Sequence, residues 1–188
     1  EQSAREERQR KTVAIEEAQA RLEGAIAALR ALGFGRVEAR AAVTEVEWPA
    51  RMQKLTHGPL IDAAPGCEIW LDGGHNPAGG EAVAATLAAL PTRPTHLICG
   101  MLNTKDVTGY MQPLARAAQS LPAVAIPGEL NPLSADDTAR FAAQAGLPAT
   151  IAPDTLDAVR RIAAEHPGAR ILICGSLYLA GRILRDNG

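Results

Sequence analysis

The stretch EIWLDGGHNPAGGEAVAATLAAL, residues 68–90, contains the change of pattern that decides the fold. It opens with an apolar run, residues 68–72, which is typical of a buried strand. Asp72 is followed by two glycines, and Asn76 stands before a proline where a helix cap is expected. Residues 78–90 then have the composition and spacing of a helix. Strand, polar turn and helix in this order predict an α/β fold.

The same alternation continues along the chain. Two apolar runs that end in glycine, residues 97–100 and 172–175, share the letters LICG and suit strands covered on both faces. Strands that alternate with helices predict a Rossmann-like, mostly parallel sheet flanked by helices. The other predicted strands are residues 52–55, 60–62, 96–100, 123–126, 149–151 and 170–174, and the other predicted helices are residues 107–120, 135–145, 155–166 and 176–186.

The first part of the chain follows a different pattern. Residues 4–32 contain no proline and a single glycine, and their apolar positions follow helical spacing, so we expect one long helix. Glycines end it, and a shorter helix is expected over residues 37–44. We therefore predict a helical segment over residues 1–48 and an α/β domain over residues 49–188.

Composition excludes several classes of protein. The chain has 188 residues, a formal net charge of −2 and 47% apolar residues. This near-neutral charge argues against a nucleic-acid-binding surface, and no apolar run is long enough to span a membrane. The first ten residues do not form a secretory signal. Three cysteines without a Cys-x-x-Cys spacing predict reduced, buried thiols in a cytoplasmic protein and no metal site.

Three polar, glycine-containing turns follow predicted strands, and parallel strands would bring them to one edge of the sheet. In open α/β sheets this carboxyl edge is where ligands bind. The turns are residues 72–77 (DGGHNP), 100–106 (GMLNTKD) and 174–178 (CGSLY).

The DGGHNP turn suits a nucleotide. Asp72 at a strand end can accept hydrogen bonds from ribose hydroxyls, and His75 can stack on a base or hydrogen-bond to it. Asn76 can cap the following helix. The alternative is a corner in which Asp72 and Asn76 only satisfy backbone N–H groups.

The other two turns suit anionic groups. Lys105 could meet a carboxylate or a phosphate, and Asp106 is a plausible helix cap. Ser176, at the start of a helix, could offer its hydroxyl and free N–H groups to an anion. The alternatives are a capped helix beside a solvated lysine, and a serine that only caps its helix. A serine hydrolase is not indicated, because no base can be assigned.

Arg51 completes the candidate set. It follows Trp48-Pro49, and its planar group suits a phosphate or a purine, although a salt bridge at the junction is the alternative. The chain has no G-x-x-x-x-G-K-[ST] motif and no G-x-G-x-x-G after a strand. If ATP binds, another segment must therefore hold its triphosphate and magnesium.

Taken together, the motifs resemble a known family. WPAR, LDGGHNPAGGEAVAATLAALP, GMLNTKD and ICGSLYLAG occur in this order. The pattern resembles the carboxy-terminal region of folylpolyglutamate synthase / dihydrofolate synthase, the folate branch of the Mur ligase superfamily. The resemblance covers about residues 22–186, and AIAALRALG at residues 25–33 is similar to the last helix of the family's central ATPase domain.

The resemblance implies a ligase reaction in a longer enzyme. ATP, with Mg²⁺ held mainly by the amino-terminal domain, phosphorylates a carboxylate of dihydropteroate or folate. The amine of L-glutamate then attacks the acyl phosphate to form an amide. This chain would be the carboxy-terminal piece, which lacks the P-loop, helps to bind nucleotide and glutamate, and is inactive alone. The full-length enzyme is expected to be a cytoplasmic monomer whose partners are these small molecules and its own ATPase domain.

The resemblance also implies roles for individual residues. Arg51 matches an ATP-contacting arginine, Asp72 the ribose-binding aspartate, and His75 and Asn76 the same loop near nucleotide and glutamate. Ser176 matches a serine proposed to seat glutamate, and Lys105 and Asp106 belong to a signature of unassigned role. We class His75, Ser176, Lys105 and Asp106 as candidate catalytic residues, and Arg51, Asp72, His75 and Asn76 as candidate nucleotide-binding residues.

The sequence departs from the family pattern at three places. Gly74 replaces a commoner alanine, and Ala50 replaces the glycine of a Pro-Gly pair. Arg21 stands where the family has a nucleotide-contacting asparagine. The alternative function is a free-standing, non-catalytic binding or regulatory module with a ligase-like fold, in which the long amino-terminal helix serves as a dimer or partner surface.

Overall fold

A computed structural model describes residues 26–33, 35, 38, 48–103, 105–129 and 131–187. The chain divides into two compact units, Glu1–Trp48 and Pro49–Gly188. In the first unit, residues 26–31 are helical, within the long helix expected from the sequence. The rest of that expected helix, and all of the expected helix over residues 37–44 except Glu38, lie outside the described residues.

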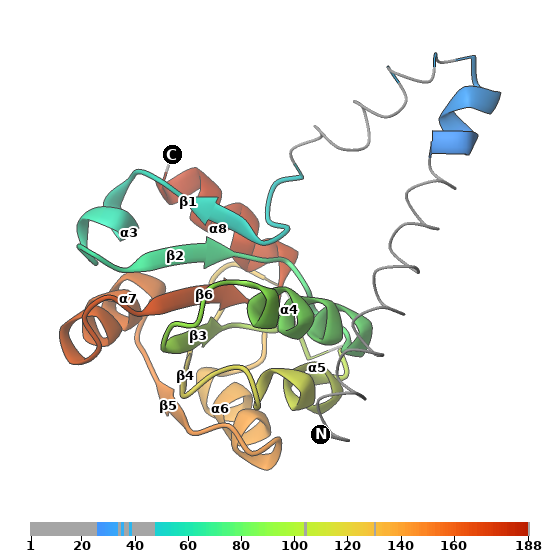
Figure 1. Ribbon diagram of the computed structural model, residues 1–188. Helices are drawn as coiled ribbons and strands as arrows, with labels where there is room; N and C mark the ends of the chain where they lie inside the picture. The colour runs from blue at the N-terminus through green and yellow to red at the C-terminus, as the bar shows by residue number, and fades with distance from the viewer. Residues whose placement is uncertain are drawn as a thin grey trace, which may run out of the picture. The chain divides into compact units, whose positions relative to one another are not determined.

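The second unit is built on a six-stranded sheet in the order β1-β2-β6-β3-β4-β5 (Figure 1). Strand β1 is antiparallel to β2, and the other neighbouring pairs are parallel. The predicted mostly parallel sheet flanked by helices is therefore confirmed. The strands are β1 Gln53–Leu55, β2 Glu68–Leu71, β3 Thr95–Cys99, β4 Leu121–Ala123, β5 Ala149–Ile151 and β6 Arg170–Cys174.

Helices cover both faces of this sheet. The helices are α3 Pro59–Asp62, α4 Pro77–Ala89, α5 Val107–Leu114, α6 Ala135–Gln144, α7 Thr155–Glu165 and α8 Leu177–Asn187. Two separate apolar cores result, one beneath α3, α7 and α8 and the other beneath α4, α5 and α6. Figure 1 shows α4 and α5 in front of the sheet and α8 behind it.

Strand β6 shows why both faces must be covered. All five of its residues are buried. Because successive side chains of a strand point to opposite faces, Ile171 and Ile173 pack into one core, while Leu172 and Cys174 pack into the other. An apolar run of this kind is stable only with helices on both sides.

Three predicted elements differ from the structure. Residues 60–62, predicted as a strand, lie in the short helix α3. Gly58 has a φ of 94°, and Pro59 occupies the first helical position, which favours a turn into a helix rather than an extended run. Leu60 N donates to Asn187 Oδ1 at 2.9 Å, so a partner distant in sequence fixes this turn.

The other two differences concern the path from α5 to β4. The helix predicted over residues 107–120 ends at Leu114, one residue after the only proline inside it, Pro113. The ladder of the next strand is Leu121–Ala123 rather than residues 123–126. Residues 124–126 remain near the sheet, where Val124 N donates to Cys99 O at 2.9 Å.

No helix of the described residues is long and apolar enough to cross a membrane.

Candidate functional site

The sheet provides a crevice at the carboxyl ends of β2 and β6. These two parallel strands are neighbours, but the helices that follow them lie on opposite faces: α4 on one and α8 on the other. The connections therefore diverge and leave space between them. Such a reversal is where open α/β sheets bind ligands.

Asp72 organises this edge. Its side chain is 4% exposed, and its Oδ2 accepts a hydrogen bond from Met52 N at 2.8 Å. Its Oδ1 accepts one from Gly74 N at 2.6 Å. Gly73 N also donates to Ala50 O at 2.8 Å, so the loop after β2 is tied to the segment before β1. A charged acceptor with two backbone N–H donors is a strong anchor.

The segment before β1 has an unusual backbone. Ala50 has a φ of 57° and Met52 a φ of 42°, a left-handed region that non-glycine residues rarely adopt. The family pattern has glycine at position 50, so this departure lies where glycine would be easiest to accommodate. The turn is held by Gln53 Oε1, which accepts from Ala50 N at 2.9 Å. It directs Arg51 toward the loop after β2.

We call the first pocket at this edge the Arg51 pocket. It has a volume of about 390 Å³. Four predicted nucleotide-binding residues line it together with the start of α4: Arg51, Asp72, His75 and Asn76. Arg51 is exposed, and Asn76 Oδ1 caps α4 by accepting from Gly79 N at 2.8 Å.

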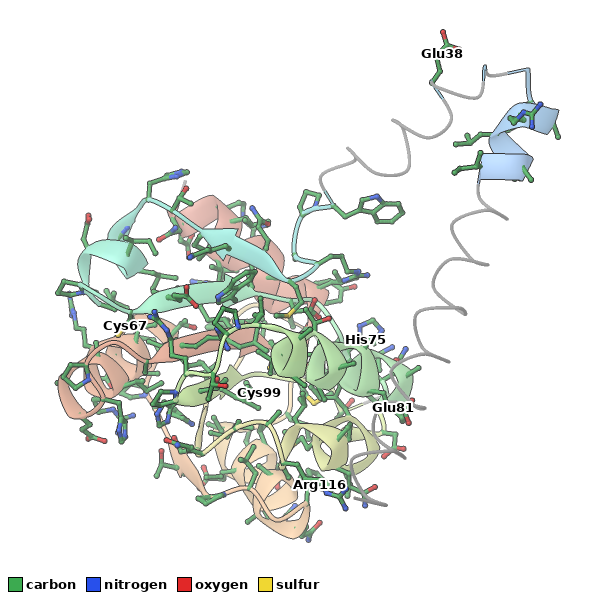
Figure 2. All side chains as sticks on the ribbon, viewed as in Figure 1. Glu38, Cys67, His75, Glu81, Cys99 and Arg116 are labelled. Carbon is green, nitrogen blue, oxygen red and sulfur yellow. The ribbon has the colours of Figure 1, made fainter. Side chains whose placement is uncertain are left out.

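The second pocket, the Ser176 pocket, adjoins it. It has a volume of about 260 Å³, and its polar lining includes His75, Lys105 and Ser176. His75 thus lines both pockets, and its Nδ1 lies 3.0 Å from Gly73 O. Figure 2 labels His75 beside the start of α4. The structure therefore brings together six of the seven predicted site residues around one crevice.

Contacts between the loops keep the two pockets adjacent. A Cβ atom at Gly73 would collide with the side chain of Leu177, and at Gly175, whose φ is 103°, it would lie 2.6 Å from Cys99 Sγ. Both glycines therefore permit close packing of the loops, whatever ligand binds. Ser176 is 3% exposed, and its Oγ accepts from Tyr178 N at 3.1 Å, which caps α8.

Asp106 is the predicted residue that does not reach the crevice. It lines neither pocket, and its Oδ1 accepts from Gly109 N at 2.9 Å as the cap of α5. The capping alternative accounts for its place in the sequence. Lys105, one residue earlier, is exposed and lines the Ser176 pocket.

Beneath the crevice lies a group of buried polar side chains. Burial raises the pKa of Tyr110 well above its usual value, and the nearby Cys174, Cys99 and Asp72 add to this effect. The hydrogen bond with Cys174 and burial raise the pKa of the Cys99 thiol. Both groups therefore stay protonated, and Cys99 is not poised as a nucleophile. All three cysteines are free, although Cys67 is partly exposed rather than buried.

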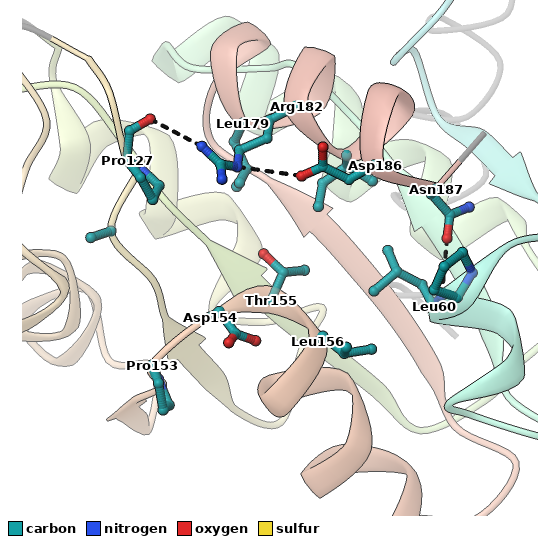
Figure 3. A pocket seen from close by; sticks show the side chains of 13 residues that line it. Leu60, Pro127, Pro153, Asp154, Thr155, Leu156, Leu179, Arg182, Asp186 and Asn187 are labelled. Atoms are coloured by element: carbon teal, nitrogen blue, oxygen red, sulfur yellow. Dashed lines mark hydrogen bonds and ion pairs between the residues drawn. The ribbon is translucent and has the colours of Figure 1, made fainter.

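A third pocket lies between α7 and α8 and includes none of the predicted site residues (Figure 3). It has a volume of about 260 Å³ and a mainly apolar lining that includes Leu60, Leu156 and Leu179. Arg182 spans it, with Nη1 3.4 Å from Pro127 O and Nε 3.4 Å from Asp186 Oδ2.

Among the described residues, no group of three His, Cys, Asp or Glu side chains could hold a metal ion.

Sequence reasoning missed several residues that shape the site. Met52 contributes a backbone N–H to Asp72, and Leu177 fills the space beside Gly73. The family's Pro-Gly preference at position 50 was the available signal for the strained turn.

Comparisons with known proteins agree with this architecture. The family described as "Mur ligase, glutamate ligase domain" matches residues 50–177. A folylpolyglutamate synthase of Lacticaseibacillus casei is 30% identical over 148 residues, which cover 77% of this chain and 31% of that protein.

Solved structures show the same fold. E. coli FolC in complex with DHPP and ADP matches with a TM-score of 0.69 at 21% identity, over 85% of this chain and 36% of that one. A bifunctional folylpolyglutamate synthase/dihydrofolate synthase with Mn, AMPPNP and L-glutamate bound matches with a TM-score of 0.62 at 20% identity, over 79% and 34%. The chain thus spans about a third of the length of these relatives. It belongs to the family of Mur ligase glutamate ligase domains.

Proposed function

We propose that the chain is the carboxy-terminal part of an ATP-dependent ligase that adds L-glutamate to dihydropteroate or to a folate. Its task in that enzyme is to hold the nucleotide and glutamate in position. Residues 1–48 would be the tail of the central ATPase domain, and residues 49–188 the carboxy-terminal domain. The observation that carries the proposal is that His75 lines both the Arg51 pocket and the Ser176 pocket.

The Arg51 pocket has the chemistry of a nucleotide site. Arg51 offers an exposed, planar cation that can bond a phosphate or stack on a purine. The amide nitrogen of Asn76 has no hydrogen-bond partner among the described residues, because only its oxygen is used in capping α4. Asp72 fixes the loop through two backbone N–H groups, so a ribose could use only the remaining acceptor capacity of its carboxylate.

The Ser176 pocket has the chemistry of a carboxylate site. Lys105 contributes a positive charge, and the amino terminus of α8 contributes its partial positive charge. The Ser176 hydroxyl can still donate its proton, because its oxygen accepts from Tyr178 N. These groups suit the α-carboxylate of glutamate, which would lie beside a nucleotide in the Arg51 pocket.

The reaction follows from this adjacency. ATP transfers its γ-phosphoryl group to the acceptor carboxylate, ADP leaves, and the glutamate amine attacks the acyl phosphate to give an amide and phosphate. The residues described here would accelerate it by positioning the reactants. As the family resemblance implies, the P-loop and most magnesium ligands would come from the amino-terminal part of the longer enzyme.

The test is an ADP titration of the ¹⁵N-labelled chain followed by NMR. We expect the amide signals of residues 72–76 to shift, and Arg51→Gln to weaken ADP binding about tenfold. Arg185→Gln removes the same charge from the exposed end of α8 and should leave the affinity unchanged. If ADP shifts only amide signals elsewhere in the domain, or none at all, the nucleotide role of this pocket is contradicted.

Catalysis provides a second test. The isolated chain should show no glutamate-dependent ATP hydrolysis. In the full-length protein, Lys105→Gln should raise the KM for glutamate more than the KM for ATP. Robust turnover by the isolated chain would contradict the proposal. Normal kinetics of the full-length variant would remove Lys105 from the glutamate site, and an absence of turnover by the full-length protein would favour the non-catalytic module. We further infer that the full-length enzyme is a cytoplasmic monomer that acts on small molecules rather than nucleic acids or membranes.

A further inference from the structure

A fourth pocket lies at the amino edge of the sheet, the edge opposite the Arg51 and Ser176 pockets. It has a volume of about 330 Å³ and lies where α4 and α5 end and β3 and β6 begin. The apolar part of its lining includes Leu87, Leu90 and Pro113. Three arginines also line it: Arg93, Arg116 and Arg170. We call it the three-arginine pocket.

Arg170 is the unusual member of this group. It is only 3% exposed, although a buried charge is costly unless it is well compensated. Its Nε donates to Glu68 Oε2 at 3.2 Å, and its Nη2 donates to Pro91 O at 3.0 Å. Its Nη1 has no hydrogen-bond acceptor within the described part of the chain.

The compensation of charge here is incomplete. Among the described residues, Glu68 is the one carboxylate that pairs with these arginines. It is shared between Lys54 at 3.0 Å, Arg170 at 3.2 Å and Arg93 at 4.0 Å. Arg116 lies just beyond the end of α5 and makes no ion pair with any described residue (Figure 2). The carboxyl ends of α4 and α5 add about half a negative charge each. A net positive charge remains after Glu68 and the two helix ends are counted.

From these observations we propose that the three-arginine pocket binds a small ligand with an oxyanion group, a phosphate or a carboxylate, on a short apolar body. The oxyanion would accept hydrogen bonds from the free Nη1 of Arg170 and from Arg116, because guanidinium groups match oxyanion geometry. The apolar body would pack against the side chains of α4 and α5. The pocket lies apart from the proposed ligase site, so it would serve as a separate binding or regulatory site.

The probes are phenyl phosphate and benzoate, with phenol as the neutral control, at constant ionic strength. Each is titrated into the ¹⁵N-labelled chain, and the amide signals of Ala88, Thr92, Thr95 and Ala117 are followed. We expect both anions, but not phenol, to shift these signals in a saturable way. A response to phenyl phosphate alone or to benzoate alone would assign the site to that anion.

The variants separate a site from general charge attraction. Arg116→Gln removes an exposed group without an ion pair in the described chain, so the fold should be retained, and binding should weaken about tenfold. Arg160→Gln removes the same charge from the exposed side of α7, on the other face of the sheet, and should not change binding. Equal effects of the two variants, or an absence of shifts at the four amides, would overturn the proposal. Arg51→Gln should not affect these shifts, so this test is independent of the ligase proposal.

Discussion

The carboxyl and amino edges of the sheet treat their charged groups in opposite ways. At the carboxyl edge, the buried Asp72 is held by backbone N–H groups, while Arg51 and Lys105 make no ion pair with any described residue. At the amino edge, Glu68 is bound by cationic side chains, Lys54 and Arg170 among them. Cationic side chains without an ion-pair partner are available to a ligand, whereas cationic side chains that share one carboxylate mainly stabilise the fold.

The pKa of Glu68 shows how strongly the amino edge is bound together. Burial alone would raise this pKa, but hydrogen bonds from Lys54 and Trp70 and the charge of Arg93 lower it below the ordinary 4.5. The two edges therefore differ in what a substitution removes. Substitution of Glu68 at the amino edge removes a structural charge, whereas substitution of Arg51 or Lys105 at the carboxyl edge removes a potential ligand contact.

The largest effect is expected for Glu68→Gln. The variant leaves the buried Arg170 without its carboxylate, and breaking such a pair costs about 3 kcal/mol of unfolding free energy. Urea denaturation measures the loss. Glu81→Gln, an exposed residue of α4, is the matched control and should change stability by less than about 0.5 kcal/mol. Equal stability of the two variants would remove the distinction between the edges.

A smaller loss, about 2 kcal/mol, is expected for Asp72→Asn, because the amide can accept from only one of the two N–H donors. Denaturation measures the loss, and Asp62→Asn at an exposed position is the control. Amide hydrogen exchange of Met52 and Gly74 should also become faster. If it does not, Asp72 is not the anchor of the carboxyl edge.

The pH dependence of stability should come in part from His96 at the amino edge. This ring is 1% exposed, stacks on His166 with centroids 4.2 Å apart, and has Nδ1 2.8 Å from Ser120 Oγ. Burial lowers its pKa below the ordinary 6.5, and His166 lowers it further, although Glu165 acts in the opposite sense. Between the lowered pKa and 6.5 the unfolded chain binds more protons, so stability is lost as the pH falls through this window.

Denaturation at a series of pH values from 7.5 downward measures this effect. In His96→Asn the slope below pH 6.5 should be shallower than in the wild type, whatever the variant's absolute stability. An unchanged slope would assign the acid sensitivity to other groups.

The smallest effect on stability is expected for Lys105→Gln, within about 0.5 kcal/mol, because the side chain is exposed and makes no ion pair with the described residues. Thermal unfolding measures this directly. A loss of more than about 1 kcal/mol would show that Lys105 has a structural role, as the cationic side chains around Glu68 have.

Much of the site could be predicted from sequence because its features are local. Asn76 before a proline indicated the start of α4, and glycines after the apolar runs marked the loops at the carboxyl edge. Asp106 shows the limit of this reasoning, since a cap and a ligand-binding carboxylate look the same in sequence. Which role applies depends on the direction of the side chain.

The sequence by itself determined the alternation of strands and helices, because periodicity and turn residues act over a few neighbours. Only the tertiary structure decided that residues 60–62 are helical, that Asp72 binds Met52, and that His75 lines two pockets. It also decided that Arg93, Arg116 and Arg170 meet in one pocket. These features depend on contacts between segments far apart in the chain, and the packing of both faces of the sheet sets those contacts.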